Sequence, residues 1–89
     1  MNTYAYDVVA QGHGKVLLNI QRPNIQPLSK VFASVCEFKE VNKALTPFVG
    51  DARMYICNIA PAEGSVQVWV NVDWGSDLNL FINLLVVNP

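Results

Sequence analysis

The chain has 89 residues, a formal net charge of −1 and a pI near 5.6. Its six Lys and Arg residues form no basic stripe, so neither nucleic acid nor an anionic membrane surface is expected as a partner. Charged residues make up 15 % of the chain, against about 25 % in an average domain. Nine Asn and four Gln take much of their place. A small domain of this composition exposes surface that a partner commonly covers, so we expect a homo-oligomer.

A chain of this length forms one domain, which we assign to residues 1–89. The N-terminus does not show the basic and apolar segments of a signal peptide. No uninterrupted apolar run exceeds four residues, whereas a membrane span needs about 20. We therefore expect synthesis in the cytoplasm and no membrane span, and we assign no final location.

Alternating apolar and polar residues predict strands, because successive side chains of a strand point to opposite faces. The first two predicted strands cover residues 4–10 and 15–21. Gly12 and Gly14 lie between them and favour a tight turn, so we predict that these strands form a hairpin. Two prolines in residues 22–27 end the second strand.

The middle of the chain is less regular. Residues 28–38 fit either a strand or a helical turn, and we favour a strand because β-branched and aromatic residues dominate the segment. We predict a loop or a single helical turn for the charged residues 39–44, a turn for residues 46–51 and a fourth strand for residues 52–60.

The clearest pattern lies between Gly64 and Asn88, where two segments alternate strictly with a period of two. A Trp-Gly-Ser-Asp corner joins them, and we predict a second hairpin. One face of this hairpin is apolar and is predicted to form the core. It consists of Val66, Val68, Val70, Val72, Trp74, Leu78, Leu80, Ile82, Leu84 and Val86.

Six predicted strands with short turns and no long helix indicate an all-β fold, either a small antiparallel β-sandwich or a small barrel. An internal repeat is an additional alternative, which would give two pseudo-symmetric three-strand units. A shift of fifty residues aligns four identical pairs, Ala10 with Ala60, Gly14 with Gly64, Val16 with Val66 and Leu28 with Leu78. Four identities are hardly above chance for strands that all alternate.

Residues for enzymatic chemistry are scarce. His13 is the only histidine, and no local motif pairs it with a nucleophile, so we expect no catalytic residues. Cys36 and Cys57 lack zinc-site spacing and are expected to be two buried free thiols, with a disulfide as the alternative. Asp73 and Asp77 bracket the corner but are too few for a calcium site. We expect neither a metal nor another cofactor.

The opposite face of the last hairpin is the best candidate for function, because it carries amides and aromatic rings where Lys, Glu and Thr are usual. An indole ring stacks on the C–H face of a sugar, and amides donate to and accept from vicinal hydroxyls. We predict Trp69 as the stacking platform, Asn71 and Asp73 as hydroxyl partners, and a second contact set at the corner. The predicted ligand-binding residues are Trp69, Asn71, Asp73, Trp74, Ser76, Asp77 and Asn79.

These features predict a non-enzymatic, lectin-like binding module that recognises a glycan as an oligomer. The alternative is a structural self-assembly subunit, such as a capsid-like or filament component, whose Asn-rich strand faces are interfaces. A third interpretation is that a loop or residues 39–44 cover Trp69 and Phe81, which would then serve packing alone.

Overall fold

The structure, a computed structural model, describes residues 2–89, which form seven strands and no helix. No helix among these residues is therefore available to cross a membrane. The strands are β1 (Asn2–Gly12), β2 (Gly14–Gln21), β3 (Lys30–Val41), β4 (Ala44–Phe48), β5 (Arg53–Ala62), β6 (Ser65–Asp73) and β7 (Leu78–Asn88).

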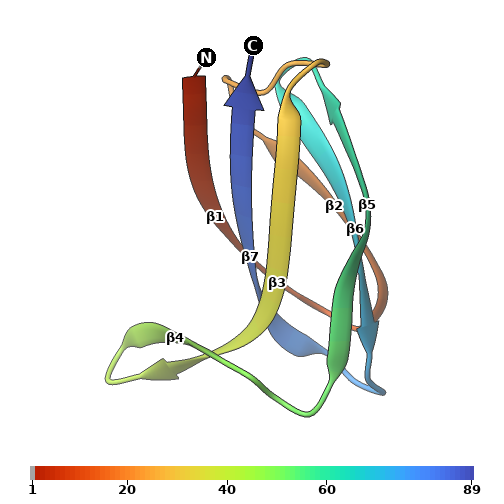
Figure 1. Ribbon diagram of the computed structural model, residues 1–89. Coiled ribbons are helices and arrows are strands. Elements are labelled where there is room, and N and C mark those ends of the chain that lie inside the picture. Colours follow the sequence, from red (N-terminus) through yellow and green to blue (C-terminus); the bar gives the residue numbers. More distant parts are fainter. Residues whose placement is uncertain (1) are drawn as a thin grey trace.

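The strands form two antiparallel sheets that face each other (Figure 1). The four-stranded sheet has the order β1-β7-β3-β4, and the three-stranded sheet has the order β2-β6-β5. The protein is therefore an all-β sandwich, as the alternating sequence pattern predicts, and the sandwich rather than the barrel is the correct alternative.

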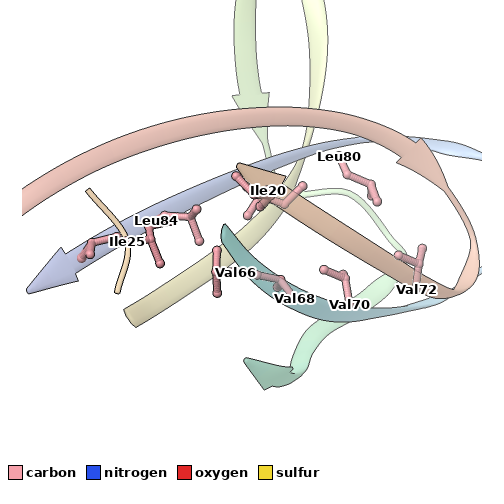
Figure 2. Close-up of a cluster of buried hydrophobic side chains, with 10 residues drawn as sticks. Ile20, Ile25, Val66, Val68, Val70, Val72, Leu80 and Leu84 are labelled. Carbon is pink, nitrogen blue, oxygen red and sulfur yellow. The ribbon is translucent and has the colours of Figure 1, made fainter. Parts of the chain in front are cut away.

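The core lies between the central strands of the two sheets. The valines of β6 point toward the leucines and isoleucine of β7, and both sets are almost completely buried (Figure 2). Ile20 from β2 and Ile25 from the connection after it complete the buried cluster. The predicted core residues within β6 and β7 form the centre of the core, with Leu78 at its margin. Trp74, which the same alternation places on the core face, is 46 % exposed, because β6 ends at Asp73 and Trp74 lies in the connection to β7.

Both predicted hairpins are wrong, because each pair of strands is divided between the two sheets. β1 pairs with β7, and β2 pairs with β6. The connection from β1 to β2 and the one from β6 to β7 are arches that carry the chain across the core from one layer to the other. In an arch the apolar faces of successive strands meet face to face, whereas in a hairpin they lie side by side, and the alternation in sequence is the same for both.

The β1–β2 arch depends on its glycines. A Cβ atom on Gly12 would lie 2.8 Å from a methyl group of Val16, and Gly14 has a φ of 64°. The first position has no space for a side chain, and the second has a left-handed conformation that glycine adopts without strain. The two glycines therefore permit the sharp crossing from one sheet to the other.

Residues 39–44 do not form the predicted loop or helical turn. They are the end of β3, a two-residue turn and the start of β4, a strand that the sequence pattern did not predict. Both turn residues, Asn42 and Lys43, have positive φ, as the turn of a tight hairpin requires. This hairpin, residues 37–48, projects from the sandwich, and we call it the arm (Figure 1).

The fifty-residue repeat does not match the topology. In the first unit, β1 and β3 belong to the four-stranded sheet and β2 belongs to the three-stranded sheet. In the second unit, β5 and β6 belong to the three-stranded sheet and β7 belongs to the four-stranded sheet. The two units thus connect the layers differently, and the four identities reflect shared strand alternation.

Candidate functional site

The predicted ligand site is divided between opposite sides of the molecule. Trp69, Asn71 and Asp73 alternate along β6 and lie on the outer face of the three-stranded sheet. Asn79 lies on β7, on the outer face of the other sheet, where its side chain accepts a hydrogen bond from Gln11 Nε2 at 3.1 Å. The residues of β6 and β7 that were predicted to share one face lie on two different faces, because an arch and not a hairpin joins the two strands.

The outer face of the three-stranded sheet is rich in amides, and we call it the amide face. It carries charged groups of both signs and one indole. Its principal residues are Lys15, Leu17, Asn19, Arg53, Tyr55, Asn58, Gln67, Trp69, Asn71 and Asp73.

Trp69 lies at the centre of the amide face. The ladder places Leu17 on one side of it and Asn58 on the other. The Lys15 ammonium lies 4.5 Å from the centroid of the indole ring, a cation–π contact. The indole Nε1 is buried and has no hydrogen-bond partner among residues 2–89. A shallow hollow opens beside the ring and is also lined by Gln67.

The remaining predicted residues lie in the β6–β7 arch at one end of the sandwich. Trp74 and Ser76 are exposed there. The Asp77 carboxylate lies 2.6 Å from His13 Nδ1, and both side chains are about half exposed. This pair joins the two arches at that end of the molecule.

The side chain of His13 pairs with an acid and not with a nucleophile in the part of the chain that the structure describes. Its side-chain hydrogen bond goes to Asp77, and no Ser or Cys is bound to it among residues 2–89. Over the same residues, no group of three or more His, Cys, Asp and Glu side chains is placed to hold a metal ion.

The two cysteines are free, as expected, but the expectation that both are buried is wrong. Cys36 on β3 is half-buried, and Cys57 on β5 is exposed. They belong to different sheets. Cys57 has the same outward phase as Arg53 and Tyr55, because Met54 and Ile56 are the residues of β5 that face the core, and it lies at a bulge where the register between β5 and β6 shifts.

The outer face of the four-stranded sheet is a feature that the sequence pattern did not predict. We call it the apolar face. Phe32 is 60 % exposed, Val9 is 54 % exposed and Leu85 is 42 % exposed on this one surface. The hydrogen-bonded ladders arrange its residues in three rows, Ala5–Leu85–Phe32, Asp7–Asn83–Ser34 and Val9–Phe81–Cys36.

The middle row of the apolar face is polar and nearly uncharged. Asn83 Nδ2 lies 3.5 Å from Ser34 Oγ, and Asp7 is the single charged residue of the three rows. A shallow hollow runs over this row and is lined by the first-row side chains. The signal was present in the sequence, since Val9, Phe32 and Leu85 occupy positions opposite to the core phase of their strands, but the strand order was needed to bring them together.

The predicted cover over Trp69 and Phe81 is also not observed. Residues 39–44 belong to the arm, whose two strands, the end of β3 and β4, pair with each other. Both rings are partly exposed.

The comparisons with known proteins add no assignment. The chain matches no protein-family model, and no curated protein and no solved structure is similar to it.

Proposed function

We propose that this protein is a non-enzymatic structural subunit that self-associates through its apolar face. The observation that carries the proposal is the exposure of Phe32 and Leu85 side by side, with Val9 across one polar row, on the same outer sheet face. Contiguous apolar surface of this kind is unfavourable in water and is typical of protein–protein interfaces.

A second copy of the chain is the partner that fits this face. A twofold axis parallel to β7 places β1 of one copy over β3 of the other, because β1 and β3 flank β7 on either side. The small Ala5 then lies opposite the large Phe32 ring, and the Ser34 hydroxyl lies where it can donate to the Asp7 carboxylate. In the third row Val9 meets Cys36.

The charge pattern supports the same partner. The apolar face carries one carboxylate in its middle row and one ammonium, Lys30, at its end. Two copies in this arrangement place Asp7 against a hydroxyl donor and not against the other Asp7. Association therefore buries apolar side chains without bringing like charges together.

The test is sedimentation equilibrium of the chain and of two matched variants. Leu85→Lys places a charge in the centre of the apolar face and is expected to weaken association at least about ten-fold. Leu17→Lys makes the same exchange on the amide face, where the leucine is even more exposed, and is expected to leave association unchanged. The proposal fails if the unmodified chain is monomeric at high concentration, or if the two variants behave alike.

A second candidate function, carbohydrate binding on the amide face, is favoured by the surroundings of Trp69. The indole lies beside a hollow, its Nε1–H has no partner among the described residues, and the amides of Asn58 and Gln67 line the same hollow. A sugar that displaces the Lys15 ammonium would stack on the ring, and the amides would bind its hydroxyls. The proposed site keeps Trp69, Asn71 and Asp73 of the predicted set and omits the arch residues.

A glycan array tests this second candidate. We expect Trp69→Ala to abolish binding, Trp69→Phe to retain part of it, and Trp74→Ala, in the arch, to leave it intact. An array with no bound glycan, or binding that survives Trp69→Ala, would remove this candidate while leaving self-association unaffected.

A further inference from the structure

The strand edges of the two sheets are protected to different degrees. An edge strand exposes unpaired backbone N–H and C=O groups, and proteins usually protect such edges with Pro, Lys, a bulge or a short strand. In the part of the chain that the structure describes, the outer edges are β1 and β4 of one sheet and β2 and β5 of the other.

Three of these edges carry such protection. β4 has only five residues, including Pro47. β5 contains Pro61 and the bulge between Ile56 and Asn58. β2 has Lys15 near its start.

β1 has none of these features. It runs for 11 residues without Pro, Lys or Arg, and its register with β7 is unbroken from Asn2 to Gly12. Its single charge is Asp7. On the opposite side of the sheet, β4 covers β3 only over Glu37–Val41, and the uncovered edge of β3, residues 30–36, begins with Lys30.

We propose that β1 is a second self-association site, at which it pairs antiparallel with β1 of another copy to make one continuous sheet. The proposal extends the self-association proposed above to a second surface, because pairing uses the backbone edge of β1 and leaves the apolar face open. A copy with both contacts touches two neighbours, so assembly continues past a dimer.

The charge of Asp7 disfavours the register centred on that residue, and the proposed register is centred on Tyr6. Pairing centred on Asp7 would place two carboxylates directly opposite each other, which is destabilising in an antiparallel pair. A shift to a centre at Tyr6 places Ala5 opposite Asp7 and Thr3 opposite Val9, and keeps residues 2–10 paired. In this register the inward side chains of both copies still point to the same side of the joined sheet.

A second copy fits this edge better than an unrelated peptide does. The strand is self-complementary in the shifted register, since each outward polar residue meets an apolar one and each core-facing residue meets another core-facing residue. Association therefore needs no partner beyond the chain itself.

Cross-linking between single-cysteine variants tests the proposal. In a background of Cys36→Ala and Cys57→Ala, one sample of Thr3→Cys is mixed with one of Val9→Cys and treated with a short thiol-to-thiol cross-linker. The Thr3→Cys/Val9→Cys product should exceed either homodimer product by about five-fold or more, because only the mixed pair is directly opposite in the shifted register. A matched control mixes Leu17→Cys with Asn19→Cys, which would meet if the protected β2 edge paired with itself about Leu18.

Failure of this inference can be distinguished from failure of the proposed function. In the apolar-face dimer β1 lies over β3 of the other copy, so residues 3 and 9 are not adjacent there. Association without the mixed β1 product, or a mixed product no stronger than the β2 control, overturns edge pairing and leaves the apolar face in place. The mixed product in the Leu85→Lys background would show edge pairing by itself.

Discussion

The two outer faces of the sandwich are formed by the same kind of alternating strand but differ in what they expose. The amide face distributes Lys15, Arg53 and Asp73 among amides, so its large side chains have charged or hydrogen-bonding neighbours. The apolar face places Phe32, Leu85 and Val9 within three adjacent strands and has one carboxylate in its centre.

Exposure alone does not distinguish the two faces. Leu17 on the amide face and Phe32 on the apolar face are both 60 % exposed. They differ in their neighbours, because Phe32 lies beside the exposed Leu85, whereas Leu17 lies beside the partly buried Trp69, whose ring is in contact with the Lys15 ammonium. This difference is the reason why we propose self-association for the apolar face and ligand binding, as a second candidate, for the amide face.

The largest expected effect is the difference in unfolding free energy between a substitution on the inner surface of β7 and one on its outer surface. Leu84 is 2 % exposed and Leu85 is 42 % exposed, although they are adjacent in β7. Leu84→Ala should lower the free energy of unfolding by about 2–4 kcal/mol through a lost core contact and a cavity. Leu85→Ala should cost less than about 1 kcal/mol in the monomer. Urea unfolding at low protein concentration measures both, and equal costs would contradict the placement of these residues.

A smaller effect is expected in the hairpin that carries the amide face. Gly64, in the turn from β5 to β6, has a φ of 75°, and no atom lies within 4 Å of the position that a Cβ would occupy there. Gly64→Ala should therefore cost about 1–2 kcal/mol of unfolding free energy through backbone strain alone. Gly75→Ala in the β6–β7 arch is the control, because its surroundings are equally open and its φ is not in the left-handed region. Thermal unfolding that is the same for both variants would contradict this assignment.

The cation–π contact on the amide face should be weaker still. Lys15→Ala removes the ammonium from the Trp69 ring and should lower the free energy of unfolding by about 0.5–1 kcal/mol. A double-mutant cycle with Trp69→Leu isolates the contact from the other effects of each substitution. An interaction energy of zero would show that Lys15 does not hold the ring, and the amide face would then have an unoccupied stacking surface.

The smallest effect is expected where the two arches meet. The His13–Asp77 pair is about half exposed on both sides, so solvent and salt weaken it. Asp77→Asn should change the free energy of unfolding by less than about 1 kcal/mol, and association should be unchanged because the pair belongs to neither outer face. A large loss of association in this variant would mean that the interface extends to the arches.

The sequence was sufficient for every described strand except β4, but not for the pairing of the strands. The alternation along residues 66–72 and 78–86 determines which side chains are buried, and this prediction is confirmed. Hairpins and arches share that alternation, so pairing depends on how the two apolar faces meet across the core. The arm was detectable in principle, since Asn42 and Lys43 separate two short strand-like runs, but the charges around them resemble a loop.

The candidate site was predicted only partly, because alternation within a strand could be recognised in the sequence and the pairing of strands could not. Trp69, Asn71 and Asp73 share a face because they alternate within one strand. Asn79 was assigned to that face only through the wrong hairpin. The apolar face could not be recognised before β1, β7 and β3 were known to be neighbours, since each contributes only one or two exposed apolar residues to it.

The most direct test of the central claim is native mass spectrometry of the unmodified chain over a concentration range of about 1 µM to about 1 mM. Self-association through the apolar face predicts a dimer whose population grows with concentration, and additional edge pairing through β1 predicts species larger than a dimer. A chain that remains monomeric over the whole range would contradict the account.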